Sequence, residues 1–242
     1  MIIDFHSHIL PGADHGSDNL ETSLKQIKKA KEIGIDVIVS TSHYYQHNET
    51  VEHFLKKRDK CYEKLQEALK KENIDIKIIK GAEVTLEVGL ADNSDLSKLC
   101  IEGTNKILIE MPMDERWTDW VYNSVYEIGA KHRITPIIAH IDRYEEKQLN
   151  KLLEMKVLCQ VNATSLCNLL KRRRILNYIK SAEAQFIGSD VHGAEAVQYE
   201  HFEKALKYIG AKNSEIVMAN SKKTLNLSQK CETEQSNEGL IF

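Results

Sequence analysis

The first sixteen residues, MIIDFHSHILPGADHG (residues 1–16), decide the fold. Ile2–Phe5 is a short and mostly apolar run, which is typical of a buried strand. His6 and His8 follow at a spacing of two, so on a strand both side chains point to the same side. After a Pro-Gly turn, Asp14 and His15 add a carboxylate and a third imidazole. Paired histidines at a strand end are as often structural as functional, but this set provides half of a metal site whose other ligands must come from elsewhere.

The composition limits the class of protein. A chain of 242 residues is long enough for one large core, and a single α/β barrel of this size is ordinary. The formal net charge of −3 gives no indication of a nucleic-acid partner, and no apolar run reaches the length of a membrane span. The cysteines are odd in number and scattered, which favours reduced thiols in a cytoplasmic protein. They are Cys61, Cys100, Cys159, Cys167 and Cys231.

Short apolar runs alternate with helical patterns about seven times along the chain, which predicts a parallel α/β barrel. We expect strands at 2–5, 35–40, 75–79, 106–109, 135–139, 157–161 and 185–187. We expect the longer helices at 17–33, 50–72, 117–131, 146–155, 166–181 and 197–209, with a closing helix after residue 220. Residues 1–228 then form one domain, and the polar residues 229–242 form a flexible C-terminal tail.

Polar residues of the kinds that bind metals stand at or just after the C-terminal ends of these strands. They are His6, His8, His43, Glu83, Glu110, His140, Asp190 and His192. Barrel enzymes carry their active sites on this face. One histidine after a strand is readily explained by packing, but a set from several separate strand ends is not. The sequence therefore predicts a metal site at this end of the barrel.

The ligand types indicate the chemistry. Histidine, aspartate and glutamate without cysteine suit Mn, Fe or Zn better than Mg. The ligands are too many for one ion, and Glu83 with Glu110 or Asp190 is placed to bridge adjacent ions. Such clusters clamp both oxygens of an in-line displacement at phosphorus, so the predicted reaction is metal-assisted hydrolysis. Cys167 and Arg173 have the Cys-x5-Arg spacing of thiol phosphatases, but the segment lacks glycine and reads as a helix, so we reject that mechanism.

Eight motifs together resemble the polymerase and histidinol phosphatase family, over about residues 1–225. They are His-x-His, the residue before Gly16, Ser-x-Ser-His43, Gly-Ala-Glu83, Leu-Ile-Glu110, Ala-His140-Ile-Asp-Arg143-Tyr with Gln-Val-Asn162, and Gly-Ser-Asp190-Val-His192. Within that family, the chain is most similar to the metal-dependent protein tyrosine phosphatases of bacterial capsule and exopolysaccharide loci.

The resemblance implies a distorted (β/α)7 barrel of the TIM-like kind and a site with two to three ions, typically Mn²⁺, with Fe or Zn as alternatives. It also implies that the substrate is phosphotyrosine on a cognate tyrosine autokinase that controls polysaccharide export. Neither nucleic acid nor stable membrane insertion is expected, and a homo-oligomer is compatible with the sequence.

By position, the resemblance assigns metal ligands and a phosphate-binding arginine, Arg143. The ligands are His6, His8, His15, His43, Glu83, Glu110, His140, Asp190 and His192. We assign catalytic roles to Arg143, His43 and His192. His15 departs from the family, whose tyrosine phosphatases usually have Asp-Asp-Gly here, so Asp14 remains an alternative ligand. The loop after His192 also lacks the arginine that the family often carries.

Other interpretations remain open at this level. A small-molecule phosphoesterase such as histidinol phosphatase has the same metal chemistry. An amidohydrolase barrel also begins with His-x-His, but Glu83 and Glu110 at successive strand ends fit it poorly. If His15 disables the site, the chain is a metal-binding interaction protein without turnover. Tyr44 and Tyr45 either line the mouth of the site or are surface aromatics.

Overall fold

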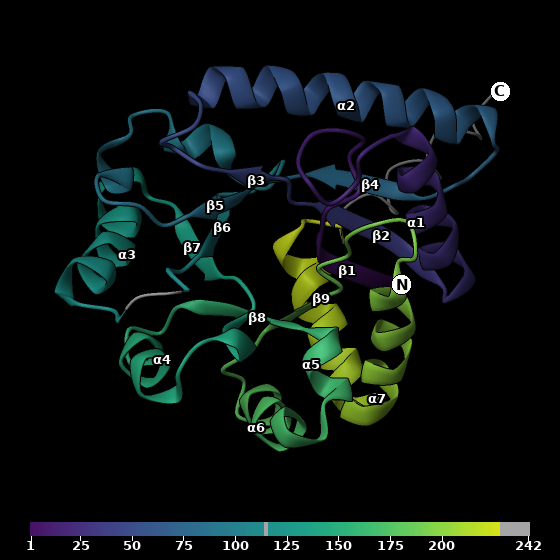
Figure 1. Cartoon of the computed structure of the whole chain (residues 1–242). Helices are drawn as coiled ribbons and strands as arrows, with labels where there is room; N and C mark the ends of the chain where they lie inside the picture. The colour runs from purple at the N-terminus through teal and green to yellow at the C-terminus, as the bar shows by residue number, and fades with distance from the viewer. Residues whose placement is uncertain (114–115, 228–242) are drawn as a thin grey trace, which may run out of the picture.

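The computed structural model describes residues 1–113 and 116–227 (Figure 1). Strands and helices alternate through most of this range. The strands are β1 (Ile2–Ser7), β2 (Ile35–Ser40), β3 (His43–Tyr44), β4 (Lys77–Lys80), β5 (Glu83–Thr85), β6 (Lys106–Glu110), β7 (Thr135–Ile138), β8 (Leu158–Asn162) and β9 (Phe186–Gly188). The α-helices are α1 (Leu20–Glu32), α2 (Val51–Lys71), α3 (Asp119–His132), α4 (Glu146–Leu153), α5 (Ala163–Cys167), α6 (Leu169–Lys180) and α7 (Val197–Thr224).

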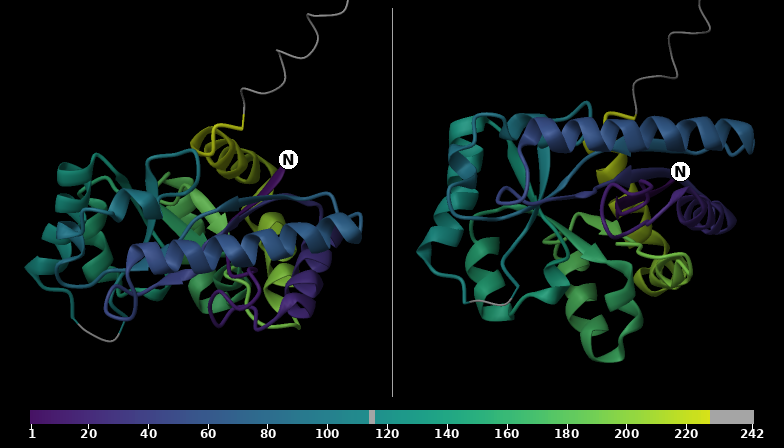
Figure 2. Two further views of the ribbon diagram at one scale, coloured as in Figure 1. Left: turned by 90° about the horizontal axis from the view of Figure 1, so that it is seen from above. Right: turned by 45° about the horizontal axis from the view of Figure 1, so that its top comes forward.

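All strand pairs are parallel, and the strands curl around a common axis with helices outside them (Figures 1 and 2). The pairing forms a three-stranded sheet, β1-β2-β4, and a six-stranded sheet, β3-β5-β6-β7-β8-β9. The two sheets are joined where β2 leads into β3 and β4 into β5, since Gly81 N–H donates to Ser40 O (2.8 Å) and Glu83 N–H to Ser42 O (3.0 Å). On the other side, Asp190 N–H donates to His6 O (2.8 Å), which places β9 beside β1.

Two apolar cores hold the sheet in place. The outer core lies between the strands and the helices, and it contains the buried faces of α1 and α2, such as Ile27 and Phe54. The inner core fills the space inside the curl with residues such as Phe5, Leu108 and Phe186. Phe5 and Phe186 stack with ring centroids 4.0 Å apart. Because the interior is packed with side chains, chemistry is confined to the ends of the strands.

Two helical predictions differ from the structure. The helix expected at 166–181 is two helices, because Asn168 has extended backbone angles (φ −80°, ψ 117°) and its side chain caps α6 by accepting from the N–H groups of Leu170 and Lys171. The helix expected at 197–209 is confirmed as the first half of α7, which ends at a kink at Gly210 (φ 77°, ψ 160°), whereas the second half begins directly after Gly210 and not after residue 220. Its second half reaches the inner core, where Ile3 N–H donates to Met218 Sδ (3.2 Å).

The expected domain boundary is not tested, because residues 229–242 lie outside the described ranges. None of the described helices combines the length and the apolar character that a membrane span requires.

Candidate metal centre

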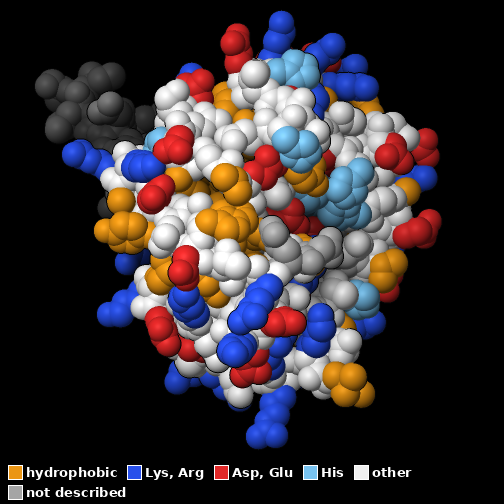
Figure 3. Space-filling model, turned by 60° about the vertical axis from the view of Figure 1, so that its left-hand side comes forward, with side chains coloured by type: hydrophobic (Ala, Val, Ile, Leu, Met, Phe, Trp, Pro, Cys, Tyr) orange, Lys and Arg blue, Asp and Glu red, His pale blue; other side chains and the backbone are white. Residues whose placement is uncertain are grey.

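The structure gathers the predicted ligand residues at the C-terminal ends of the strands. Histidines lie around a hollow on this face, with acidic side chains among them (Figure 3). Within residues 1–113 and 116–227, three groups of side chains have their ligand atoms within 4.8 Å of one another. The groups are His6-His8-Glu83-Asp190, His43-Glu83-Glu110 and His8-His43-His192. Glu83, His8 and His43 each belong to two groups, so the groups form one continuous cluster.

The first group has the geometry of a cation site. Nε2 of His6 lies 3.1 Å from Nε2 of His8, and both lie 3.1 Å from Glu83 Oε2. Asp190 Oδ1 lies 3.4 Å from His8 Nε2 and 3.7 Å from His6 Nε2. All of these side chains are buried. Burying so many acceptors together is costly unless a proton or a cation lies among them.

The opposite nitrogens of these histidines fix their tautomers. Nδ1 of His8 lies 2.8 Å from Asp14 Oδ2, and a carboxylate accepts, so this Nδ1 carries the hydrogen. Nδ1 of His6 lies 3.1 Å from Gln160 Oε1, which also accepts from the backbone N–H of His140 (2.7 Å). Each ring therefore directs its Nε2 at the centre of the group, as metal-binding histidines do.

The second group, His43-Glu83-Glu110, extends the cluster beyond Glu83. His140 belongs to none of the three groups, but it lies beside both carboxylates of this one. Glu83 Oε1 lies 2.8 Å from His140 Nε2, while its Oε2 faces His6 and His8, so this carboxylate is placed to bridge two positions. Glu110 Oε1 lies 3.5 Å from the same nitrogen of His140, and Glu110 Oε2 accepts from Thr85 (3.0 Å).

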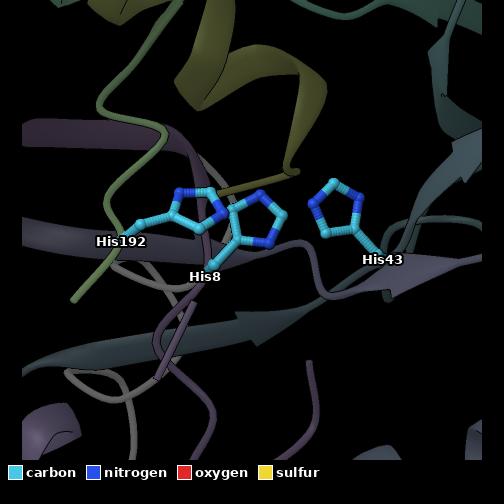
Figure 4. A group of neighbouring side chains, drawn as sticks. All are labelled: His8, His43 and His192. Carbon is cyan, nitrogen blue, oxygen red and sulfur yellow. The ribbon is translucent and has the colours of Figure 1, made fainter. Parts of the chain in front are cut away.

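The third group contains imidazoles alone. Figure 4 shows His8 between His192 and His43, with the rings directed toward one another. The ring centroid of His8 lies 4.4 Å from each of the other two. Nδ1 of His43 is buried and lies 3.3 Å from Glu83 Oε2, although it makes no hydrogen bond among the described residues. Burial, followed by the nearby His8, lowers the pKa of His43 to about 4, so the ring is neutral at neutral pH.

His15 and Asp14 have different places from those of the buried ligands. His15 is exposed at the rim, and its ring lies 4.8 Å from His43 and from His192. It belongs to none of the three groups. Asp14 instead orients His8 and accepts from the backbone N–H of His43 (2.9 Å). Its pKa is lowered despite burial, chiefly because of the charge on His8.

The charges in the cluster depend strongly on one another. Although burial opposes it, Asp14 raises the pKa of His8 well above its ordinary value. Hydrogen bonds to Glu110 and Glu83 likewise outweigh burial and raise the pKa of His140 to about 9. Burial alone would raise the pKa of Glu83. The nearby His6 is the first of the causes that lower it well below its ordinary value. In the metal-free protein, protons therefore occupy the positions that a cation would take.

Arg143 lies at the edge of the cluster, where its guanidinium pairs with Asp190. Its side chain is 36% exposed, so it is accessible from the hollow. Asp190 Oδ2 also accepts from Asn162 Nδ2 (2.8 Å). The prediction that Arg143 belongs to the site agrees with this position. A phosphate-binding role for it stays a prediction.

The sequence reasoning missed two positioning residues. The roles of Gln160 and of Asp4 were not predicted, although Gln160 occurs in the recognised Gln-Val-Asn162 motif. Asp4 is buried on β1 and accepts from Ser189 N–H (2.8 Å) and Oγ–H (2.6 Å), so it anchors the segment that carries Asp190. The only advance signal for Asp4 was a charged residue within an apolar strand.

Two other sequence predictions are resolved. Tyr44 is buried and packs edge-on against Phe54, so it does not line the site. Tyr45 stacks on His43 with ring centroids 5.4 Å apart and does lie at the cluster. Cys167 ends α5, and burial raises the pKa of its thiol, which agrees with the rejection of a thiol mechanism.

Two glycines allow the histidines to approach the neighbouring backbone. A Cβ on Gly188 would lie 2.5 Å from the Cβ of His6, and one on Gly16 would lie 2.0 Å from the Cβ of His8. Real Cβ atoms do not make such contacts. Glycine is therefore required at both positions by the packing around the cluster.

Fold and cluster together define a curled parallel α/β protein with a candidate metal centre. Residues 2–226 match the sequence profile of the family described as capsular polysaccharide synthesis, CpsB/CapC. The chain belongs to this family.

Curated relatives and solved structures agree with that assignment. The tyrosine-protein phosphatase CpsB of Streptococcus agalactiae is 26% identical over 214 residues, which cover 80% of this chain and 84% of that protein. The protein of the same name from Streptococcus pneumoniae is 24% identical over 250 residues, which cover 93% and 98%. A structure from a study of YwqE from Bacillus subtilis and CpsB from Streptococcus pneumoniae, described as metal-dependent tyrosine phosphatases, matches with a TM-score of 0.78 and 23% identity. That match covers 93% of this chain and 94% of the other chain. A TatD-like protein from Archaeoglobus fulgidus shares the fold more distantly, with a TM-score of 0.54 and 14% identity.

Proposed function

We propose that this protein is a metal-dependent phosphatase that hydrolyses phosphotyrosine on a protein substrate in capsular polysaccharide synthesis. The observation that carries the proposal is the cluster of three overlapping ligand groups, with Arg143 at its edge. Membership in the CpsB/CapC family and the names of the curated relatives support the substrate class. The natural substrate that we propose is a tyrosine autokinase, as the sequence resemblance implies.

The donor set supports two to three divalent ions, with Mn²⁺ as the first candidate and Fe or Zn as alternatives. His6, His8, Glu83 and Asp190 would hold one ion. Glu110 and His140, with the other oxygen of Glu83, would hold a second, and His43 and His192 a third. When bound, such ions polarise phosphoryl oxygens and lower the pKa of an attacking water. His15 is a rim residue in this assignment, able to reach the third position only after its ring turns.

The side chains of the protein provide the rest of the chemistry. Arg143 is placed to hold two phosphoryl oxygens with its planar guanidinium and to neutralise the charge that develops on them. Asp190, paired with it, fixes the guanidinium at the edge of the cluster. A tyrosine phenolate has a pKa of about 10, so it leaves with little help from a general acid. The positioning of the phosphoryl group and the neutralisation of its developing charge therefore account for most of the lowering of the activation barrier.

We also propose that the curled sheet is the seven-stranded barrel expected from the sequence. In this count, β2 and β3, which follow one another along the chain, form one strand that is interrupted near its C-terminal end. The same holds for β4 and β5. These interruptions fall where His43 and Glu83 turn toward the cluster.

Substrate competition tests the proposed function directly. The metal-loaded protein should hydrolyse a phosphotyrosine peptide with a much higher kcat/KM than histidinol phosphate, and a chelator should abolish both activities. A preference for histidinol phosphate would assign the site to a small-molecule phosphoesterase. Metal binding without turnover of either compound would make the chain a non-catalytic metal-binding protein.

A further inference from the structure

A groove of about 920 Å³ opens beside the metal centre, between the segment that follows β6 and the segment that follows β7. Arg143 and Tyr144 line this groove. The same two residues contact the cluster, since Arg143 pairs with Asp190 and the Tyr144 hydroxyl lies 3.2 Å from Nδ1 of His140. The groove is therefore continuous with the place where a phosphoryl group would be held.

The floor of the groove is aromatic and fixed in position. Trp117 is only 5% exposed, and its ring lies edge-on to Tyr144 with centroids 5.0 Å apart. Trp117 Nε1–H donates to Pro112 O (2.8 Å), and the Tyr122 hydroxyl donates to Gln148 O (3.2 Å). A floor held by such bonds is formed before a ligand arrives, which lowers the entropy cost of binding.

Among the residues that the structure describes, basic side chains outnumber acidic ones along the rim of the groove. Arg116, Lys147 and Lys151 line it in addition to Arg143, and the acidic residues described there are Asp119 and Glu145. Figure 3 shows Lys and Arg side chains on this face below the histidines, with Asp and Glu side chains among them.

The two rim lysines differ in their present contacts. Lys151 is already engaged, 3.1 Å from Asp119 and over the ring of Tyr122 at 4.1 Å. Lys147 is exposed and makes no ion pair with any residue that the structure describes. Its charge is thus open to a ligand.

We propose that this groove binds the peptide segment next to the phosphotyrosine, and that it favours segments with acidic side chains. The inference rests on the proposed phosphatase function and adds a specificity element to it. The aromatic floor contacts the peptide, the basic rim pairs with its carboxylates, and Arg143 marks the end of the groove at which the phosphate enters the metal centre. Complementary charge at such a rim acts on substrate capture more than on the chemical step.

The test compares four metal-loaded proteins: wild type, Lys147→Glu, the double variant Lys147→Glu/Lys151→Glu, and Lys180→Glu as a matched control. Lys180 is an exposed lysine at the end of α6 and does not line the groove. The substrates are p-nitrophenyl phosphate and two phosphotyrosine peptides, which carry either glutamates or glutamines on both sides of the phosphotyrosine. Thermal melts show whether each variant is folded.

Wild type should have a lower KM for the glutamate peptide than for the glutamine peptide. The double variant should raise the KM for the glutamate peptide by about tenfold, and Lys147→Glu by about threefold, with kcat nearly unchanged. The p-nitrophenyl phosphate kinetics should be the same in all four proteins, because that compound has no flanking segment.

Equal KM values for the two peptides in wild type would overturn the inference while leaving the phosphatase function intact. So would a folded double variant that behaves like Lys180→Glu. If metal-loaded wild type hydrolysed none of the three substrates, the proposed function would fail, and this inference with it.

Discussion

At the scale of single residues, the candidate site depends on which atom of each histidine faces the centre. Asp14 and Gln160 accept from Nδ1 of His8 and His6, so both rings direct Nε2 inward. Sequence spacing identified the two histidines but not these partners. Asp14 lies close in sequence, whereas Gln160 comes from β8, and only the fold brings it to β1. Long-range partners of this kind have no local signal in a sequence.

Arg143 should act on the phosphoryl group and not on the stability of the protein. Arg143→Ala in the metal-loaded protein should lower kcat on a phosphotyrosine peptide by about 100-fold or more, because one preformed donor to the developing charge is lost. Arg143→Lys should recover only part of this loss, since an ammonium lacks the bidentate fork. Steady-state kinetics beside thermal melts measure both effects. Near wild-type kcat/KM for Arg143→Ala would place the phosphate clamp elsewhere.

Gln160 should control metal affinity through His6 and His140. Gln160→Met keeps the length of the side chain but removes the acceptor for His6 Nδ1 and for the backbone N–H of His140. Loss of such an orienting bond typically weakens metal binding by about 10 to 100-fold. Titration of the metal-depleted protein with Mn²⁺ measures the affinity directly. An unchanged affinity in a folded Gln160→Met protein would show that the histidines are oriented without it.

At the scale of elements, the sequence predicted the strands that carry the ligands and most of the helices between them. Its errors lie where a single residue breaks a regular pattern. Asn168 ends α5 and caps α6 within a continuous apolar pattern, and the second half of α7 begins directly after the kink at Gly210, earlier than the closing helix expected after residue 220. The interruption of β2 before His43 was also not predicted. Periodicity reports which face is buried, but it does not report a local change of backbone direction.

The close approach of β9 to β1 gives a test at this scale. Gly188→Ala would place a Cβ 2.5 Å from that of His6, so one strand must shift and the first ligand group should be disrupted. We expect loss of most of the bound metal and of most activity. The matched control is Gly129→Ala in α3, where the new Cβ would lie 3.5 Å from Ile134 O, an ordinary contact. Alanine there should stabilise the helix by up to about 1 kcal/mol. If the Gly188→Ala protein bound the full amount of metal, β9 and β1 would be able to move apart without disrupting the ligand group.

At the scale of the whole molecule, metal binding, protonation and stability are coupled. The pKa of His140 is raised to about 9, and that of His8 is also raised. A raised histidine pKa stabilises the metal-free fold fully below the unfolded value of about 6.5. This contribution is lost as the pH rises through 9 for His140. The metal-free protein should therefore become less stable between pH 7 and 9, whereas the metal-loaded protein should not.

The same coupling predicts that metal uptake at pH 7 releases protons from the cluster. Calorimetric titration in two buffers with different ionisation enthalpies measures the number released. Binding heats that do not depend on the buffer would mean that the histidines are already neutral in the metal-free protein.

The central claim is that several ions, held by residues from separate strands, are required for hydrolysis of phosphotyrosine. The most direct measurement is the rate of hydrolysis of a phosphotyrosine peptide by metal-depleted protein as Mn²⁺ is added, with bound metal determined by elemental analysis at each step. Turnover should be absent in the depleted protein and should reach its full value only after more than one equivalent has bound. Full turnover with less than one equivalent of metal bound would contradict the claim.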